Sequence, residues 1–208
     1  MTPTVLVVDH GVGNLSSVAK GIEDSGGRAT ISSDPAALAR ADLVLLPGVG
    51  AFDAAMRELC ARGWVEPLRE AARRIPLLGI CLGMQLLGDH SAEGDGLVPG
   101  LGLVPGVVAR LTPQAEDERI PHVGWNEVAF ERSGELFDGV ADRTDFYFAH
   151  SYHLVPTSPA DVVARSTYCG GFVAAVARGS VLGCQFHPEK SSHAGRRLLA
   201  NFVRLARC

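Results

Sequence analysis

The chain has 208 residues, 47% of them hydrophobic and 20% charged, and its 24 glycines are spread along the sequence, which excludes a disordered or fibrous protein. The formal net charge of −4 arises from 19 Lys and Arg against 23 Asp and Glu. Because the basic residues are scattered, nucleic acid is not expected as a primary partner. This length predicts one domain over residues 1–208.

No apolar stretch approaches the ~20 residues that a membrane span needs, so no membrane partner is expected. The first apolar run, residues 5–8, is followed by Asp9 and is too short for a targeting segment. The five cysteines form no Cys-x-x-Cys pair, which argues against a disulfide framework. We therefore expect a cytoplasmic protein.

The first half of the chain alternates short apolar runs with helical patterns, which is typical of βαβ units around a parallel sheet. Runs that are apolar throughout predict buried strands at Thr4–Val8, Leu43–Leu46 and Leu77–Ile80. Apolar residues at helical spacing predict two helices, whose buried faces are Leu15, Val18, Ala19 and Ile22, and Phe52, Ala55, Met56 and Leu59. Asp34-Pro35 predicts the capped start of a further short helix.

After Leu87 the helical pattern gives way to Gly and Pro residues typical of irregular loops and tight turns, at positions 94, 96, 99, 100, 102, 105 and 106. Strands are expected at Val107–Arg110, Trp125–Val128, Asp145–His150, Val162–Thr167, Phe172–Ala177 and Val181–Phe186. Arg178-Gly179-Ser180 predicts a hairpin between the last two strands, and an amphipathic helix is expected over Ala194–Ala206. The predicted fold is a single α/β domain with a mixed sheet, parallel early and antiparallel late, flanked by helices.

Gly79-Ile80-Cys81-Leu82-Gly83 lies where an apolar strand meets a helical pattern, and it is a thiol version of the Gly-x-Ser-x-Gly nucleophile elbow. Glycines on both sides relieve crowding around a residue held on a strained turn. Such a turn exposes the sulfur and directs a helix N-terminus toward it, which favours the thiolate. A buried core cysteine is the alternative, but the flanking glycines and the strand-turn-helix context favour a nucleophile at Cys81.

A thiol with an ordinary pKa of ~8.5 is mostly protonated at neutral pH and needs a base. Among the seven histidines, His187 is the candidate, because it follows a predicted strand and lies two residues before Glu189. In extended backbone, which Pro188 favours, residues two apart face the same side, so the carboxylate is expected to orient the imidazole. A surface turn with two solvated side chains is the alternative.

Other patterns are weaker. Gly11-Val12-Gly13 lacks the third glycine of a dinucleotide fingerprint, since Ser16 stands there, so no nucleotide cofactor is expected. His90, His122 and His193 lack ligand spacing with cysteines or carboxylates, so no metal site is expected. The sequence predicts no cofactor.

Together, the motifs resemble those of the class I glutamine amidotransferases, and the match spans nearly the entire chain. The family's nucleophile motif, oxyanion strand and His-Glu motif are matched by Gly79-Ile80-Cys81-Leu82-Gly83-Met84-Gln85, Pro47-Gly48-Val49-Gly50 and Gln185-Phe186-His187-Pro188-Glu189. Residues 121–126, 146–152 and 190–192 are similar to the branch of this family that supplies the glutaminase subunits of imidazole glycerol phosphate synthases.

The resemblance implies a class I amidotransferase fold and a triad of Cys81, His187 and Glu189 that hydrolyses glutamine to glutamate and ammonia. It also implies an oxyanion hole formed by backbone N–H groups of Leu82 and at or near Val49. The residues that it implies for the amino-acid end of glutamine are Gly50, Gln85, Ser151 and Tyr152.

The chain holds no second domain to use the ammonia, which would be mostly protonated in neutral water, so we expect a separate acceptor subunit to dock over the site. The resemblance implies a (β/α)₈ cyclase that joins ammonia to a phosphoribulosyl-formimino nucleotide and yields imidazole glycerol phosphate and aminoimidazole carboxamide ribotide for histidine synthesis. Candidates for the docking face are Asn14, Trp125, Tyr147 and Lys190, with core packing as the alternative for Trp125 and Tyr147.

Three other functions stay open. One is a non-catalytic scaffold, which the presence of all three triad residues disfavours. Another is a stand-alone thiol hydrolase such as a peptidase or amidase, which would be fully active without a partner. The third is a glutaminase for anthranilate, aminodeoxychorismate or pyridoxal phosphate synthesis, against which Met84 and Lys190-Ser191 favour the histidine pathway.

Overall fold

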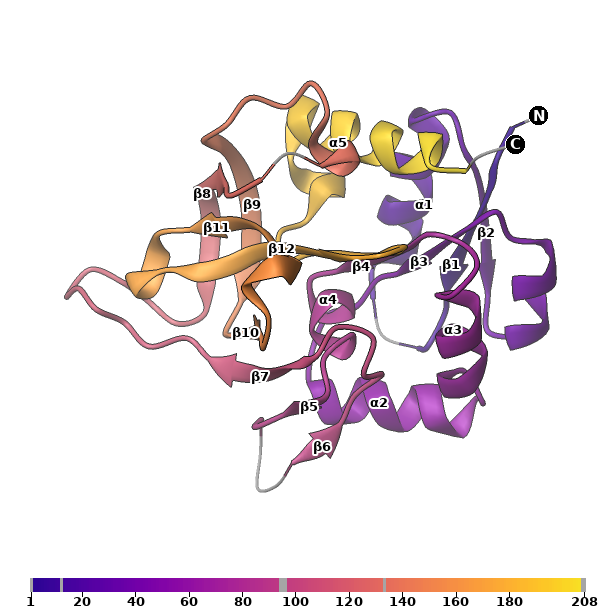
Figure 1. The fold of residues 1–208 in the computed structure, drawn as a ribbon, viewed down its shortest axis with the longest axis horizontal. Helices are drawn as coiled ribbons and strands as arrows, with labels where there is room; N and C mark the ends of the chain where they lie inside the picture. The colour runs from indigo at the N-terminus through magenta and orange to yellow at the C-terminus, as the bar shows by residue number, and fades with distance from the viewer. Residues whose placement is uncertain (1, 12, 94–96, 133, 207–208) are drawn as a thin grey trace.

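The computed structural model describes residues 2–11, 13–93, 97–132 and 134–206, which form two sheets with helices around them (Figure 1). The strands are β1 (Thr4–Val8), β2 (Arg28–Ser32), β3 (Leu43–Leu46), β4 (Leu77–Ile80), β5 (His90–Ser91), β6 (Val98–Pro99), β7 (Gly106–Arg110), β8 (His122–Phe130), β9 (Thr144–His150), β10 (Tyr152–Pro156), β11 (Val162–Ser166), β12 (Phe172–Arg178) and β13 (Val181–Cys184). The α-helices are α1 (Leu15–Asp24), α2 (Phe52–Ala61), α3 (Val65–Ala71), α4 (Leu82–Leu86) and α5 (Ser192–Arg204). Short 3₁₀ turns are η1 (Pro35–Arg40), η2 (Glu135–Phe137), η3 (Pro159–Asp161), η4 (Tyr168–Gly170) and η5 (Pro188–Lys190).

The larger sheet has the strand order β2-β1-β3-β4-β13-β12-β11-β8-β9. Its first five strands run parallel, and the pairings from β13 to β9 are antiparallel. This arrangement confirms the predicted mixed sheet, parallel early and antiparallel late. The predicted hairpin joins β12 to β13 through Gly179 and Ser180, and Gly179 has the left-handed φ of 58° that a tight turn requires.

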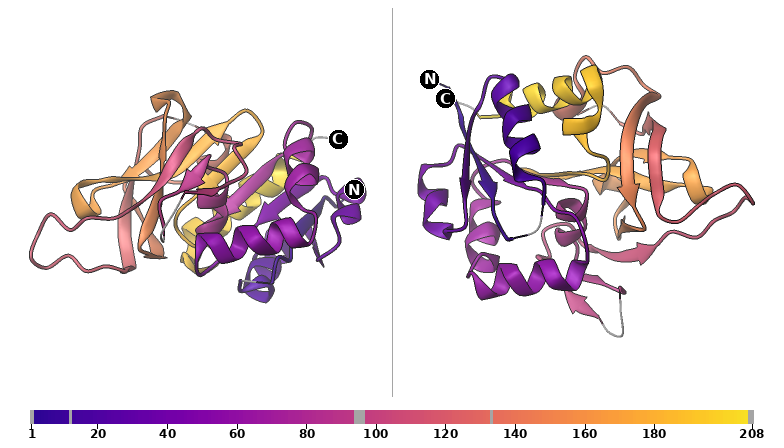
Figure 2. Two further views of the ribbon diagram at one scale, coloured as in Figure 1. Left: turned by 90° about the horizontal axis from the view of Figure 1, so that it is seen from below. Right: turned by 180° about the vertical axis from the view of Figure 1, so that it is seen from behind.

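Helices cover both faces of the parallel half, so it has a hydrophobic core on each side. One core joins Val5, Leu43 and Leu45 to α1 and α5, and the other joins Leu6 and Val44 to α2, α3 and α4. Figure 2 shows this layering from behind, with α1 and α5 above the sheet and α2 below it. Because neighbouring residues of a strand point to opposite faces, a strand covered on both faces is apolar at every position, as β1, β3 and β4 are.

The smaller sheet, with the order β10-β7-β5-β6, was not predicted. Its strands β5 and β6 have two residues each, and β10 follows β9 after Ser151 alone, so no separate apolar run marks them. The sequence also missed α3, which has seven residues, and the edge strand β2, whose side chains are largely exposed. The predicted loop residues Gly94 and Gly96 lie outside the described residues.

Two predicted strands have bounds that were wrong by two or more residues, and four others differ by one residue at one end. β13 ends at Cys184 rather than Phe186, because the chain bends away from the sheet at Gln185. β8 spans His122–Phe130 rather than Trp125–Val128, because residues 122–124 also pair with β9 and Phe130 pairs with β11.

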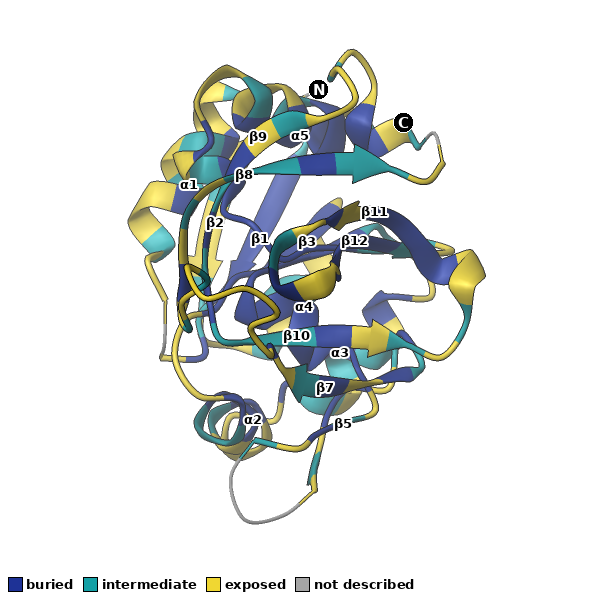
Figure 3. Cartoon of the chain, turned by 90° about the vertical axis from the view of Figure 1, so that its left-hand side faces the viewer, coloured by how far each residue is buried: buried dark blue, intermediate teal, exposed yellow. Residues whose placement is uncertain are grey.

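Ser151 lies where the chain passes from the larger sheet to the smaller one. His150, the last residue of β9, pairs with His122 on β8, whereas Tyr152, the first residue of β10, pairs with Arg110 on β7. Figure 3 shows β8 and β9 above β10 and β7, with buried strands in dark blue behind them. The bend at Ser151 therefore connects the two sheets.

Candidate active site

Cys81 occupies a strained turn between β4 and α4. Its φ of 54° and ψ of −110° fall in a region that residues with a Cβ rarely adopt. A Cβ on Gly79 would lie 2.6 Å from the carbonyl oxygen of Gly83, and a Cβ on Gly83 would overlap the carbonyl of Leu46. Both glycines are therefore needed for close packing around the turn, and the predicted nucleophile-elbow geometry is present.

His187 and Glu189 follow β13 and lie beside Cys81. Nδ1 of His187 is 2.9 Å from Oε1 of Glu189, and the two side chains are only 4% and 2% exposed. The contact was predicted from extended backbone, and His187 is extended, but residues 188–190 form the 3₁₀ turn η5. The turn, rather than an extended tripeptide, brings the carboxylate to the imidazole.

The electrostatics of His187 suit a proton donor facing a thiolate. Burial alone would lower its pKa, because the charged ring is desolvated. Hydrogen bonds to Cys81 and Glu189, together with the negative charges of these two groups, outweigh burial and raise the pKa of His187 to about 9. The ring is therefore protonated at neutral pH and carries a proton that it can donate next to the sulfur.

A cavity of about 230 Å³ opens in front of Cys81. Its lining includes all the residues predicted for the oxyanion hole and for glutamine binding: Val49, Gly50, Leu82, Gln85, Ser151 and Tyr152. His187 and Glu189 line a small adjoining cavity of about 20 Å³, together with Val49, Asn14 and Lys190. The structure thus brings together residues that lie far apart in the sequence at the carboxyl end of the parallel strands, where open α/β sheets bind ligands.

The segment Pro47-Gly48-Val49-Gly50 lies against the elbow. A Cβ on Gly48 would be 3.1 Å from the Cβ of Leu82, and Gly50 has a φ of 95°. Nε2 of His10 donates a hydrogen bond of 2.7 Å to the carbonyl of Pro47 and so fixes the start of this segment. Among the described residues, none accepts a hydrogen bond from the backbone N–H of Val49 or Leu82, which leaves both groups free to donate to a ligand.

The buried side-chain amides of Gln85 and Gln185 form hydrogen bonds next to the cavity. Nε2 of Gln85 donates to the carbonyl of Tyr152 at 2.8 Å and to Oε1 of Gln185 at 3.2 Å. Nε2 of Gln185 lies 3.7 Å from the sulfur of Cys81. One pair of buried amides therefore connects the nucleophile to the strand that begins at Tyr152.

Similarity to known proteins assigns the chain to a family. The family model for class-I glutamine amidotransferases matches residues 6–206. The chain is a class I glutamine amidotransferase. It is 45% identical over 207 residues to the imidazole glycerol phosphate synthase subunit HisH of Aromatoleum aromaticum, with 96% of this chain and 97% of that protein covered. It is 47% identical over 204 residues to HisH of Moorella thermoacetica, with 98% and 95% covered.

Solved structures agree with this fold at lower identity. The structure of PurLQS from Thermotoga maritima matches with a TM-score of 0.76 and 20% identity, covering 98% of this chain and 99% of that one. A crystal structure of a glutamine amidotransferase matches with a TM-score of 0.75 and 19% identity, covering 97% of this chain and 98% of that one. Together with the family match, these similarities support the predicted fold class.

The residues predicted for docking form an exposed cluster on this amidotransferase, here called the docking cluster: Asn14, Trp125, Tyr147 and Lys190. The ring centroids of Trp125 and Tyr147 are 6.0 Å apart on the paired strands β8 and β9, and Nζ of Lys190 lies 5.5 Å from the centre of the Tyr147 ring. Trp125 is 51% exposed, so it is not a core residue, and Tyr147 is half-buried. The carbonyl of Tyr147 accepts a hydrogen bond of 2.8 Å from the backbone N–H of His187, so the cluster contacts the catalytic site directly.

Sequence reasoning missed Glu93, which lines the cavity of the amidotransferase. Its Oε2 accepts a hydrogen bond of 2.8 Å from the backbone N–H of Phe52, at the start of α2. The only sequence signal is a carboxylate in a glycine-containing stretch, which is too common to single out. Pairing of β5 with β7 places this segment beside the cavity.

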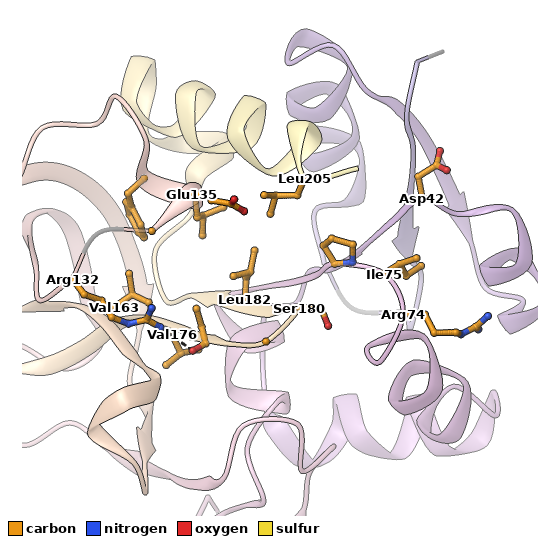
Figure 4. Close-up of a pocket in the computed structure, with 16 residues that line it drawn as sticks. Asp42, Arg74, Ile75, Arg132, Glu135, Val163, Val176, Ser180, Leu182 and Leu205 are labelled. Atoms are coloured by element: carbon orange, nitrogen blue, oxygen red, sulfur yellow. Dashed lines mark hydrogen bonds between the residues drawn. The ribbon is translucent and has the colours of Figure 1, made fainter. Parts of the chain in front are cut away.

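A cavity of about 610 Å³ lies at the opposite edge of the sheet, where β4 and β13 begin (Figure 4). Leu182 and Leu205 contribute apolar surface, and Arg74 and Asp42 contribute charge. No histidine or cysteine is among the described residues that line it. The hydroxyl of Ser180 donates to the carbonyl of Ala72, so it is not activated as a nucleophile.

In the described part of the chain, no helix has the length and apolar composition to cross a membrane.

Proposed function

We propose that this amidotransferase is the glutaminase subunit of an imidazole glycerol phosphate synthase. It hydrolyses glutamine to glutamate and ammonia, and a separate (β/α)₈ cyclase subunit joins the ammonia to a phosphoribulosyl-formimino nucleotide. The products are imidazole glycerol phosphate and aminoimidazole carboxamide ribotide, made in the cytoplasm for histidine biosynthesis. The observation that carries the proposal is that Cys81 contacts His187, and His187 contacts Glu189, next to a cavity lined by Cys81, in a chain similar over its length to HisH subunits.

The first half-reaction forms a thioester. The Cys81 thiolate attacks the side-chain carbonyl carbon of glutamine, and the carbonyl oxygen becomes an oxyanion. His187, protonated because its pKa is about 9, gives its proton to the leaving nitrogen as the C–N bond breaks. Ammonia leaves, and the glutamyl group stays on the sulfur.

The second half-reaction hydrolyses the thioester. His187, now neutral, removes a proton from water, and the resulting hydroxide attacks the thioester carbonyl. The C–S bond breaks, glutamate leaves, and the thiolate and imidazolium are restored. In both steps the backbone N–H groups of Val49 and Leu82, two residues that line the cavity, serve as oxyanion donors, each typically worth ~100 to 1000-fold in rate.

The cavity walls supply groups for the amino-acid end of glutamine. Gly50, Gln85, Ser151 and Tyr152 offer peptide and polar side-chain groups, and the Glu93 carboxylate suits the α-ammonium group. A volume of about 230 Å³ is below the range of about 300–1,000 Å³ of pockets for drug-sized ligands. This small size favours a single amino acid over the peptide that a thiol peptidase would bind.

The docking cluster gives the cyclase a surface next to the triad. An exposed Trp with a neighbouring Tyr and Lys has the composition of an interface centre, where aromatic and cationic residues contribute most of the binding energy. A partner seated there covers the small cavity that Asn14 and Lys190 line together with His187 and Glu189. Ammonia can then reach the acceptor before bulk water protonates it.

Reconstitution tests this function. The purified chain is mixed with the cyclase subunit or, in a separate experiment, with a chorismate-binding subunit from the same organism, and complex formation and product are measured with glutamine as nitrogen donor. We expect a complex with the cyclase and formation of imidazole glycerol phosphate. A productive complex with the chorismate-binding subunit, or full activity of the chain alone, would overturn the proposal in favour of another glutaminase or a stand-alone hydrolase.

A further inference from the structure

A line of hydrogen bonds runs from strand β8 to the catalytic cavity through two histidines. Nδ2 of Asn126 lies 3.4 Å from Nε2 of His122, and Nδ1 of His122 lies 3.2 Å from Nε2 of His150. Nδ1 of His150 lies 2.9 Å from the carbonyl oxygen of Tyr152. His122 and His150, here called the histidine pair, are cross-strand partners on β8 and β9.

Only one assignment of protons satisfies all these contacts with neutral rings. A carbonyl oxygen only accepts, so Nδ1 of His150 carries a hydrogen and its Nε2 does not. That bare Nε2 must accept from Nδ1–H of His122, which leaves Nε2 of His122 bare to accept from the amide of Asn126. Both rings are therefore Nδ1–H tautomers, and every bond in the line has one donor and one acceptor.

The surroundings of the histidine pair keep both rings neutral. Burial lowers the pKa of His122 to about 4 and that of His150 to about 3. The hydrogen bond to the Tyr152 carbonyl raises the pKa of His150 but does not overcome its burial, and the neighbouring His122, His153 and His187 lower it further. Glu118 favours protonation of His122 but does not overcome its burial. The rings pack among aromatic side chains: His122 stacks on Tyr168 and Phe148, and His150 meets Phe172 edge-on.

The line ends on the backbone carbonyl of Tyr152, a residue that lines the cavity. The carbonyl of Tyr152 accepts from two donors, His150 and Gln85, so both of its lone pairs are used. Tyr152 begins β10, and Ser151 before it is the residue at which the chain changes sheets. Ser151, Tyr152 and His150 all line the cavity. The position of this wall therefore depends on the donors that hold one carbonyl.

We propose that His122 and His150 are positioning residues whose serial hydrogen bonds fix the Tyr152 carbonyl and so hold residues Ser151 and Tyr152 in place for glutamine. The inference rests on the proposed function for the identity of the ligand. The histidine pair moves no proton in the reaction; it acts through the peptide that it holds. Loss of a ring hydrogen bond therefore weakens glutamine binding more than it slows the chemical steps.

The protons of the histidine pair can be observed without an activity assay. The full-length chain labelled with ¹⁵N-histidine is studied by two-dimensional ¹H–¹⁵N NMR, with His122→Asn and His150→Asn variants to assign the two rings. Both rings are expected as neutral Nδ1–H tautomers at pH 7. An Nε2–H tautomer or a charged ring at either position would overturn the proposal.

Kinetics of the assembled enzyme test the positioning role. His122→Phe keeps the aromatic stack and removes the hydrogen bonds, and we expect KM for glutamine to rise about three- to tenfold with kcat changed less than about twofold. His150→Leu is expected to act in the same way, whereas in His150→Asn the side-chain amide replaces Nδ1–H as donor to Tyr152 and restores most of the affinity. His153→Asn, on the same strand as Tyr152 but outside the line, is the matched control with unchanged KM.

The outcomes separate the two proposals. Unchanged KM in folded His122→Phe would refute the positioning role even if glutamine is the substrate. A wild-type complex that does not consume glutamine would refute the proposed function, while the tautomers seen by NMR would still decide whether the hydrogen-bond line exists. A fall in kcat equal to or larger than the rise in KM would also contradict the inference, because it would place the pair in the chemical steps.

Discussion

Replacing Glu189 with Gln removes one negative charge from the triad and leaves its geometry nearly unchanged. Oε1 of Glu189 is 2.9 Å from Nδ1 of His187, so the amide oxygen of Gln can still accept that hydrogen bond. The NH₂ group then takes the place of Oε2, which has no hydrogen-bond partner in the described structure. The variant therefore separates the charge of Glu189 from its orienting role.

The pKa of His187 gives the expected size of the effect. It is about 9 instead of 6.5: burial lowers it, and the hydrogen bonds and charges of Cys81 and Glu189 more than compensate. If Glu189 supplies about half of the net rise, its loss destabilises the imidazolium by roughly 1.4–2 kcal/mol, since one pKa unit is worth about 1.4 kcal/mol. We expect kcat/KM for glutamine to fall about ten- to thirtyfold in Glu189→Gln. In His187→Ala, which removes proton transfer from both half-reactions, it should fall ~100 to 10,000-fold.

The pH dependence gives a second readout of the same charge. The imidazolium is present below the pKa of His187 and is lost as the pH rises through it, so activity should decline above about pH 9 in the wild type. In Glu189→Gln this alkaline limb should move down by about one pH unit. The assay is kcat/KM for glutamine in the assembled enzyme between about pH 6 and 10, a range that covers the alkaline limbs of the wild type and of Glu189→Gln. Equal losses in Glu189→Gln and His187→Ala, or an unmoved alkaline limb, would refute the reasoning.

Three further predictions concern docking, packing and the oxyanion strand. Trp125→Ala should weaken binding of the partner by at least about tenfold in a titration of the two subunits, without changing the unfolding midpoint. Ile31→Ala, which changes a similarly exposed residue on the edge strand β2, should leave binding unchanged, and equal effects of the two variants would exclude the docking cluster from the interface. Gly83→Ala should destabilise the chain by more than about 2 kcal/mol in urea unfolding, because its Cβ would overlap the carbonyl of Leu46, and a normal midpoint would show that the elbow can relax. The isolated chain should release glutamate slowly, and the partner with its bound ligand should raise the rate by orders of magnitude. The reason is that glycines on both sides of Val49 leave its peptide free to rotate out of donor orientation. A comparable kcat for the chain alone, with the partner, and with the partner and its ligand would mean that the oxyanion hole is preformed.

The parallel half of the fold was predictable because burial on both faces leaves a direct trace in the sequence. β1, β3 and β4 have the predicted bounds, since helices on both sides make each of their positions apolar. The edge strand β2 has one neighbour and exposed side chains such as Ile31, so it leaves no such trace. The smaller sheet depends on pairing between distant segments, which no local pattern encodes.

The catalytic triad was predictable for a related reason. An elbow needs glycines within two residues of Cys81, and the His187–Glu189 contact spans two residues, so both leave short motifs. Even so, the contact is made by a 3₁₀ turn and not by the extended backbone from which it was predicted. Glu93 and the His122–His150 pair leave no comparable motif, because only strand pairing brings Glu93 to the cavity and the two histidines to each other.

The central claim is a division of labour between two chains, and Cys81→Ser tests it most directly. Synthesis of imidazole glycerol phosphate is measured in the reconstituted complex, once with glutamine and once with a high concentration of ammonium salt, with Cys60→Ser as the control for an exposed cysteine outside the site. The account predicts that Cys81→Ser abolishes the glutamine-dependent rate and leaves the ammonium-dependent rate intact, while the control retains both. Loss of both rates in a folded complex, or a surviving glutamine-dependent rate, would contradict it.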